Sequence, residues 1–297
     1  MQVGVYGGGK MGEALALRLI ETGHSVCLFN RSPLGEKKIE RLAGVSIFHD
    51  LEPFFACQST PRVLWLMVPA QSMDDIQEQL AHYLREDDIL LDGGNCHYKD
   101  TLVRHARWER VGVGYVDVGI GGGLEGLRKG ACFMVGGDES VVRRVERLFV
   151  DLAHEGGYAY LGNSGSGHYV KMVHNGVEYA MMAAIGEGLD LLSSGPYPVD
   201  LSQTCSIWSN GSTISGSLMS LSAEVLGDPD FEQVRGIIDT SGEAGWTLQE
   251  SLERHVAIPT LASALFSRFK SKDADRLSER MVALLRRAFG GHEVYKK

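Results

Sequence analysis

The feature that most constrains the fold is a change of pattern near residue 162 of this 297-residue chain. Before that point short apolar runs alternate with helical stretches, and after it the strand-like runs stop. The apolar runs lie at 3–6, 26–29, 63–68, 89–91, 113–116 and 133–135. This alternation predicts a doubly wound parallel sheet with covering helices over 1–162. The remainder, 163–297, predicts an all-helical domain with helices at 168–194, 199–226, 231–239, 246–254, 259–270 and 273–288.

Charge and cysteine usage exclude several classes of function. The formal net charge is -9 and there is no Lys/Arg-rich block, so we expect neither nucleic acid nor a membrane surface as partner. A small anionic substrate held by a few local cations remains allowed. The first residues match neither a signal peptide nor a membrane span, which predicts a cytoplasmic protein. Five scattered cysteines without a C-x-x-C pair predict reduced thiols and no metal site.

A glycine motif predicts the nucleotide site. Residues 7–12 read G-x-G-x-x-G, with Gly7, Gly9 and Gly12 around Lys10 and Met11, after a predicted strand and before a predicted helix. In that context the glycines let a pyrophosphate approach the backbone and the helix N-terminus. The same pattern recurs at 121–126, but without an acidic or basic residue at the end of a following strand, so we do not interpret it as a second cofactor site.

The end of the second predicted strand favours NADP. The residues there are Asn30, Arg31 and Ser32, where NAD-specific proteins usually carry an acid for the ribose hydroxyls and NADP users often carry an Arg. The alternative is that Arg31 is an ordinary surface charge and that both NAD and NADP bind.

One predicted helix carries an unusual polar face. Lys171, His174, Asn175, Glu178 and Tyr179 are spaced as i, i+3, i+4, i+7 and i+8, and therefore share one side of a helix. The residues between them are mostly apolar, which predicts a helix buried on its other side. A solvated face is the alternative, although such faces usually alternate Glu with Lys or Arg.

Four stretches together resemble 6-phosphogluconate dehydrogenase, in particular its shorter decarboxylating form within the β-hydroxyacid dehydrogenase superfamily. They are 5–12, 92–95 (Asp-Gly-Gly-Asn), 165–179 and 289–292 (Phe-Gly-Gly-His), and they span nearly the whole chain. The resemblance implies a Rossmann-type domain over 1–162 and a helical substrate-binding and oligomerisation domain over 163–297.

The resemblance also implies roles for the polar helix face. Oxidising a β-hydroxy acid requires a base for the hydroxyl proton and a hydride acceptor, and the decarboxylated product then needs an acid. Lys171 resembles the family's base, Glu178 its acid, and Asn175 the residue that orients the hydroxyl. A lysine serves as a base near neutral pH only if burial or a nearby cation lowers its pKa, and a buried face beside His174 is such a setting.

Further substrate and cofactor contacts are implied in the same way. His174 resembles a substrate hydrogen-bonding partner, Tyr179 a phosphate contact, and Asn95 the residue between nicotinamide and substrate. The remaining matches are Val68, Pro69 and Ala70 in the cofactor wall, Gly122 and Gly123 in the carboxylate loop, and Arg268, Arg286 and His292 at the phosphate. Arg286 is adjacent to Arg287, so its assignment depends on counting back from His292. In the family the tail reaches a neighbouring subunit, which implies a homo-oligomer, dimer or tetramer.

Three departures from the family pattern lie at the substrate. Gly121 stands where the family has a Ser for the carboxylate, Gly245 where it has Arg or Lys beside the phosphate, and Ile120 where it has a small polar residue. Hydrogen bonds to charged groups contribute about 1.5–3 kcal/mol each. Losing two would weaken binding of 6-phosphogluconate by roughly two to four orders of magnitude. A backbone amide, a water, Lys129 or Lys270 is an alternative source of compensation.

Three hypotheses follow. The preferred one is NADP-dependent oxidative decarboxylation of 6-phosphogluconate to ribulose 5-phosphate. The second keeps this chemistry on another β-hydroxy acid. The third, a non-catalytic NADP-binding sensor, predicts loss of a proton carrier, whereas Lys171, Asn175 and Glu178 are all present.

Overall fold

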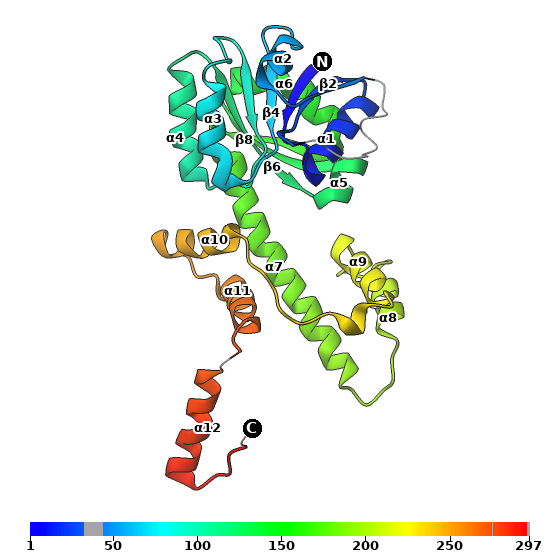
Figure 1. Ribbon diagram of the computed structural model, residues 1–297. Helices are drawn as coiled ribbons and strands as arrows, with labels where there is room; N and C mark the ends of the chain where they lie inside the picture. The colour runs from blue at the N-terminus through cyan, green and yellow to red at the C-terminus, as the bar shows by residue number, and fades with distance from the viewer. Residues whose placement is uncertain (33–43, 275, 296–297) are drawn as a thin grey trace. The chain divides into compact units, whose positions relative to one another are not determined.

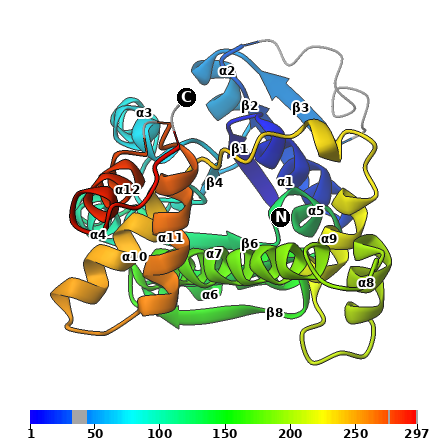
Figure 2. The same ribbon diagram turned by 90° about the horizontal axis from the view of Figure 1, so that it is seen from below.

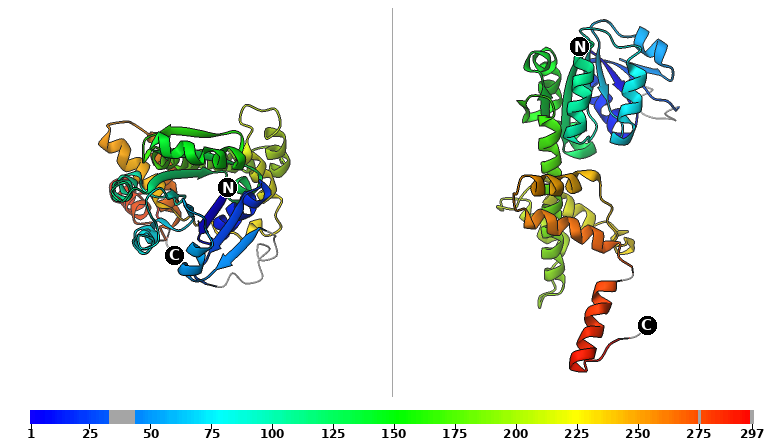
Figure 3. Two further views of the ribbon diagram at one scale, coloured as in Figure 1. Left: turned by 90° about the horizontal axis from the view of Figure 1, so that it is seen from above. Right: turned by 90° about the vertical axis from the view of Figure 1, so that its left-hand side faces the viewer.

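The computed structural model describes residues 1–32, 44–274 and 276–295. The chain divides into two compact units, Met1–Asn175 and Gly176–Lys297. The division falls inside α7 (Ser166–Ser193), a single continuous helix that is drawn in green in Figures 1 and 3. The domain boundary expected near residue 162, where the last strand ends, stays a prediction.

Unit 1 contains an eight-stranded sheet in the order β3-β2-β1-β4-β5-β6-β7-β8. The strands are β1 (Gln2–Tyr6), β2 (Ser25–Phe29), β3 (Val45–Phe48), β4 (Val63–Leu66), β5 (Ile89–Asp92), β6 (Gly114–Gly121), β7 (Ala131–Gly137) and β8 (Ala153–Gly162). The first six are parallel, in the 3-2-1-4-5-6 order of dinucleotide-binding folds. The doubly wound sheet is therefore confirmed.

The last two strands correct the expectation of an entirely parallel sheet. β7 runs antiparallel to β6, and β8 runs parallel to β7. The connection from β6 to β7 holds only the short helix α5 (Gly123–Lys129) between Gly122 and Gly130, which both have positive φ. Such a short connection joins antiparallel neighbours, whereas parallel strands need a longer crossover.

Helices cover both faces of the sheet (Figures 1 and 2). One hydrophobic core lies under α1 (Lys10–Glu21), α5 and α6 (Glu139–Leu152), and the other under α2 (Leu51–Ala56), α3 (Met73–Leu80) and α4 (Tyr98–Glu109). Successive strand residues point to opposite faces. Trp65 therefore belongs to the first core, while Leu64 and Leu66 belong to the second.

Unit 2 is helical, as predicted. Besides its part of α7 it contains α8 (Leu201–Trp208), α9 (Ser217–Leu226), α10 (Gly242–Glu253), α11 (Pro259–Ser271) and α12 (Leu277–Gly290). The helix expected over 199–226 is broken at 209–216, where Gly211 and Gly216 have positive φ. The helix expected over 231–239 is wrong, because only the 3₁₀ turn η3 (Phe231–Gln233) forms there. In the described part of the chain no helix is long and apolar enough to span a membrane.

Candidate active site

Four loops of unit 1 meet at one edge of the sheet. β1, β4, β5 and β6 are parallel, so their carboxyl ends lie at the same edge. The predicted site residues follow these ends: the glycine motif after β1, Val68–Ala70 after β4, Asn95 after β5 and Gly122–Gly123 after β6. This is the edge at which parallel α/β sheets bind their ligands.

The glycines of the nucleotide motif have distinct structural roles. Gly7 has φ +111°, and a Cβ on it would lie 2.5 Å from the carbonyl oxygen of Met67. A Cβ on Gly12 would collide with the carbonyl oxygen of Gly7. Gly9 is the N-cap of α1, and a Cβ there would meet nothing within 4 Å. Gly7 and Gly12 thus allow the loop, α1 and the segment after β4 to pack closely. Gly9 leaves the N-terminus of α1 open to a ligand, and a helix N-terminus is a favourable place for a pyrophosphate. Lys10 beside it is exposed and Met11 is half-buried.

Asn30 connects the end of β2 to this loop. Its Oδ1 accepts a hydrogen bond from the Gly8 amide at 3.0 Å, and its Nδ2 donates to the Ser32 carbonyl at 2.6 Å. Arg31 and Ser32 are exposed. Burial raises the pKa of Tyr6, and the positive charge of Arg31 opposes that rise. The segment is therefore next to the glycine loop.

The loops after β4 and β5 contact each other. A Cβ on Gly94 would lie 3.1 Å from the carbonyl oxygen of Val68. Val68 and Ala70 are half-buried, and Ala70 begins the 3₁₀ turn η2 (Ala70–Ser72). Pro69 and Asn95 are exposed, and they follow the carboxyl ends of β4 and β5.

The first turns of α7 lie on glycines of the sheet. A Cβ on Gly119 of β6 would lie 2.5 Å from Cβ of Lys171, and one on Gly136 of β7 would lie 2.7 Å from the Gly167 amide nitrogen. Lys171 is 7% exposed and Asn175 8% exposed. Lys171 is thus buried where the missing side chain of Gly119 leaves room for it.

This arrangement corrects part of the expected orientation of α7, because the apolar Met172 and Ala180 are buried as predicted, at 1% and 9% exposed, but other apolar residues are not. The polar residues Lys171 and Asn175 are buried, while the apolar Val170, Val177 and Met181 are 37%, 43% and 52% exposed. The prediction of a buried apolar side was therefore wrong for these three residues. The sequence pattern identifies two faces, but it does not say which face the sheet accepts.

His174 and Asn175 form the end of the unit 1 site. Nδ1 of His174 lies 3.1 Å from Oδ1 of Asn175, within hydrogen-bonding distance. A Cβ on Gly121 would lie 3.6 Å from Nε2 of His174. Gly122 and Gly123, which follow, have φ of +100° and +62° and are exposed. The second glycine pattern also connects a strand to a helix, a context that the sequence did not indicate.

Unit 2 contains an aromatic and cationic cluster of its own. The Tyr179 hydroxyl lies 2.8 Å from Oγ of Ser241, and the Arg268 guanidinium carbon lies 3.4 Å from the centroid of the Tyr179 ring. Nη1 of Arg268 donates to the Asp239 carbonyl at 3.0 Å. Stacking on an aromatic ring orients a guanidinium while leaving donors for an anion. Glu178, the preceding residue on α7, is half-buried.

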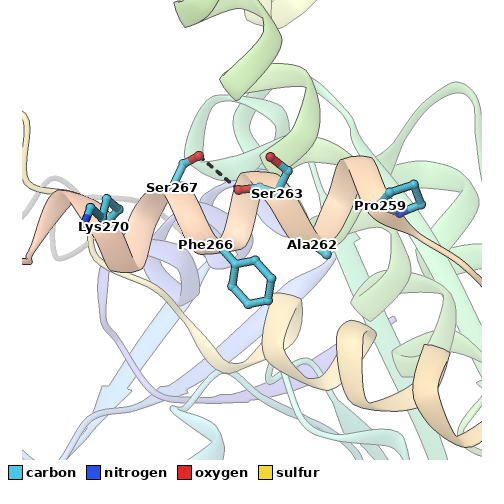
Figure 4. Close-up of a pocket in the computed structure, with 6 residues that line it drawn as sticks. All are labelled: Pro259, Ala262, Ser263, Phe266, Ser267 and Lys270. Carbon is cyan, nitrogen blue, oxygen red and sulfur yellow. Dashed lines mark hydrogen bonds between the residues drawn. The ribbon is translucent and has the colours of Figure 1, made fainter. Parts of the chain in front are cut away.

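The other expected anion contacts lie near the C-terminus. Arg286 is exposed on α12, and His292 is exposed just beyond it. A shallow depression elsewhere in unit 2 is lined only by α11, from Pro259 to Lys270 (Figure 4). Its polar lining includes Ser267, whose hydroxyl donates to the Ser263 carbonyl at 3.0 Å. A surface of one helix without convergent charge does not have the character of a substrate site.

His105, Glu109 and Asp138 are the one group of three metal-ligating side chains found among the described residues. Nε2 of His105 lies 4.0 Å from a carboxylate oxygen of each acid, and the two acids are 66% and 46% exposed. Ordinary surface ion pairs explain this arrangement. The absence of a metal from the function stays a prediction.

Two buried residues of the site region were not given roles by the sequence. His168 lies in the matching stretch 165–179, and Asp117 lies shortly before the departures at Ile120 and Gly121; both are fully or almost fully buried. Asp117 could have been noticed in the sequence because it is a charged residue among apolar strand residues. For His168 the indication was its position on α7, one turn before Lys171 and on the same face.

The fold and the site define an NAD(P)-dependent oxidoreductase with a Rossmann-type domain and a helical second domain. The model of the NAD binding domain of 6-phosphogluconate dehydrogenase matches residues 2–162, and the model of the 6-phosphogluconate dehydrogenase C-terminal domain matches residues 167–293. The chain belongs to the 6-phosphogluconate dehydrogenase family.

Relatives of similar length exist in bacteria and archaea. The chain is 39% identical to Bacillus subtilis YqeC, provisionally named a 6-phosphogluconate dehydrogenase, over 100% of both chains. It is 38% identical to the NAD(+)-dependent, decarboxylating 6-phosphogluconate dehydrogenase of Haloferax volcanii, over 100% of this chain and 99% of that one. The structure of Plasmodium falciparum 6-phosphogluconate dehydrogenase is similar with a TM-score of 0.79 at 24% identity, and the match covers all of this chain and 66% of that one.

Proposed function

We propose that the protein catalyses the NADP-dependent oxidative decarboxylation of 6-phosphogluconate to ribulose 5-phosphate. The observation that carries the proposal is α7, which holds Lys171 against Gly119 and carries Asn175 and Glu178 on the same side of one helix. A buried amine, an amide and a carboxylate in this order match what the reaction requires of its proton carriers.

The chain's own residues account for the proton transfers. Lys171, with a neutral amine, takes the hydroxyl proton of the substrate as the carbinol carbon becomes a ketone, while Asn175 orients that hydroxyl. Bound NADP would supply the hydride acceptor. As carbon dioxide leaves, Lys171 returns its proton to the carbonyl oxygen, which gives the enediol. Glu178 then donates a proton to the enediol carbon while Lys171 takes the proton back from the oxygen, which gives the ketone. The carboxyl group leaves as carbon dioxide, so no water is consumed.

Arg31 supports NADP as the preferred cofactor. It is exposed just after β2, where a 2′-phosphate would meet a guanidinium. Gly7, Gly9 and Gly12 would hold the pyrophosphate, with Lys10 and Met11 opening α1 beside it. The Haloferax volcanii relative is named NAD(+)-dependent. Comparison of both cofactors is therefore part of the test.

A different β-hydroxy acid is the second candidate substrate. A Cβ on Gly121 would make only ordinary contacts, of 3.4 Å or more, and one on Gly245 would meet nothing within 4 Å. The first side-chain atom would fit at both positions, so a clash at Cβ does not explain the missing Ser and Arg. This observation favours a substrate whose anionic groups differ from those of 6-phosphogluconate.

We also propose a homo-oligomer, dimer or tetramer. Unit 2 exposes many large apolar side chains on α11 and α12: Phe266, Phe269, Leu277, Met281, Val282, Leu284 and Leu285. Exposed apolar residues at this density are typical of protein interfaces. A second copy is the proposed partner, and light scattering after size-exclusion chromatography measures the oligomer size. The cytoplasmic location stays a prediction.

The test follows reduced cofactor and released carbon dioxide together. Wild-type protein receives 6-phosphogluconate, gluconate or 3-hydroxyisobutyrate, each with NADP and with NAD.

Lys171→Ala should lower kcat at least about 100-fold and leave NADP binding unchanged. Arg143→Ala, which removes an exposed cation paired with Glu139 on α6, is the control and should keep full activity. Turnover of another acid but not of 6-phosphogluconate would favour the second candidate. NADP binding without any turnover would favour a sensor.

A further inference from the structure

The His168 imidazole connects both ends of the segment that carries Asn95. Its Nε2 lies 3.2 Å from the carbonyl oxygen of Asp92, where β5 ends, and its Nδ1 lies 2.7 Å from Oγ1 of Thr101 on α4. A carbonyl oxygen only accepts, so Nε2 carries the hydrogen in the neutral ring and Nδ1 accepts from the Thr101 hydroxyl. The His168 side chain is fully buried.

The buried Asp92 carboxylate accepts hydrogen bonds from the same segment and from a neighbouring strand. Its Oδ1 accepts from the Gly94 amide at 3.0 Å and from the Cys96 thiol at 3.7 Å, and its Oδ2 accepts from the Tyr115 hydroxyl at 2.5 Å. Burial and the Asp92 charge raise the pKa of both Cys96 and Tyr115, so both groups stay protonated and able to donate. The residue on each side of Asn95 is therefore fixed, while Asn95 itself is exposed.

The backbone of His168 is fixed to the sheet independently. Its amide donates to Oδ2 of Asp117 at 2.9 Å, and the Gly165 amide donates to Oδ1 at 2.7 Å. A Cβ on Gly167 would lie 2.5 Å from the Met134 carbonyl oxygen, so the helix start is in close contact with β7. Lys171 follows one turn later on the same helix face.

We propose that His168 is a positioning residue that holds the Asn95 loop, residues 93–97, at a fixed place relative to Lys171. The role rests on the proposed function, in which Asn95 contacts nicotinamide and substrate and Lys171 moves the hydroxyl proton. His168 acts through these two residues. Its ring links the loop to α7, and its amide links α7 to β6.

Three substitutions separate the two ring contacts. The amide nitrogen of Gln lies as many bonds from Cα as Nε2 of His, so His168→Gln keeps the contact with Asp92. His168→Asn matches Nδ1 and keeps only the contact with Thr101, and His168→Ala keeps neither. We expect kcat to fall by about 10- to 100-fold in the Ala and Asn variants, because a misplacement of about 1 Å costs that much. His168→Gln should retain kcat within about fivefold, and the KM for NADP should change little in all three.

The control removes a buried histidine elsewhere in unit 1. His24 contacts the Met1 amino group at 3.0 Å and Asp151 at 3.3 Å, near the amino end of β2. His24→Ala should lower stability and leave kcat unchanged. If His24→Ala lowers kcat as much as His168→Ala, the effect is general destabilisation and the positioning role is refuted.

Hydrogen exchange provides a readout that needs no turnover. In NADP-bound protein, amides of residues 93–97 should exchange faster in the Ala and Asn variants than in wild type and His168→Gln, with residues 2–12 unchanged. Unchanged exchange in His168→Ala overturns the positioning role even if the protein is an active dehydrogenase. If exchange is faster in His168→Ala but the wild-type protein oxidises no β-hydroxy acid, the result supports the role of His168 in holding the Asn95 loop and overturns the proposed function instead.

Discussion

Replacing Gly119 with Ala tests whether a missing side chain positions the proposed base. The new Cβ would lie 2.5 Å from Cβ of Lys171 and 3.0 Å from the Gly167 carbonyl oxygen. Carbon atoms in contact normally lie about 3.5–4.0 Å apart, so one partner must move by about 1 Å. β6 pairs with β5 and β7 on its two sides, so we expect α7 to move.

We expect Gly119→Ala to lower both the stability of the protein and its kcat. Overpacking a well-packed interface lowers the free energy of unfolding by about 1–3 kcal/mol. Displacing the proposed base by about 1 Å lowers kcat by about 100-fold, equivalent to roughly 2.7 kcal/mol in the activation barrier. The KM for NADP should stay close to the wild-type value, since the glycine loop is not touched.

Steady-state kinetics measures the change in kcat, and urea denaturation measures the change in the free energy of unfolding. Gly186→Ala is the matched control, because Gly186 lies on the same helix and a Cβ there meets nothing within 4 Å. It should preserve kcat and raise stability by up to about 1 kcal/mol through helix propensity. A Gly119→Ala variant with wild-type kcat, together with an unmoved Lys171 in its crystal structure, would refute the reasoning.

Three further predictions use the same protein. Gly121→Ser restores the hydroxyl that the family pattern contains, and it should lower the KM for 6-phosphogluconate about 10-fold or more if a carboxylate binds there; an unchanged KM would contradict that placement. Arg31→Ala should raise the KM for NADP by about 10-fold or more and leave that for NAD nearly unchanged, as judged by assays with both cofactors. Burial lowers the pKa of His24, and the nearby amino terminus adds to this effect. His24 therefore takes up its proton at a higher pH in the unfolded chain than in the folded chain. The free energy of unfolding should be at its full value above about pH 6.5 and should decrease as the pH falls towards the lower folded pKa. His24→Gln should remove this decline from urea midpoints measured between pH 7 and 5, and an identical decline in both proteins would refute the assignment.

The outline of the fold was predictable because buried strands leave apolar runs in the sequence. β1, β2, β4 and β5 are such runs, and all four are confirmed. β8 was missed because its residues are mostly exposed or half-buried, so it carries no continuous apolar run. The direction of β7 depends on the short connection through α5, and local periodicity does not encode how a strand runs relative to its neighbour.

Helical spacing correctly grouped Lys171 and Asn175 on one face, but the direction of that face depended on tertiary context. Spacing places residues on a common side, whereas burial depends on what the opposing element offers. Here the opposing element offers Gly119, whose missing side chain accommodates Lys171. The role of His168 was likewise hidden, because its contacts Asp92 and Thr101 are 76 and 67 residues away in sequence.

Two groups of glycines near the proposed site differ in how closely their neighbours pack, and this difference separates catalysis from substrate choice. At Gly119, Gly136 and Gly167 a Cβ would lie within 2.6 Å of neighbouring atoms, so these positions are fixed by the approach of α7 to the sheet. At Gly121 and Gly245 a Cβ would fit without displacing its neighbours. Substitutions at the second group can therefore change the anion contacts without moving the proposed proton carriers. The same α7 machinery would then serve different β-hydroxy acids, and substrate choice should follow positions 121 and 245 more closely than any residue packed between α7 and the sheet.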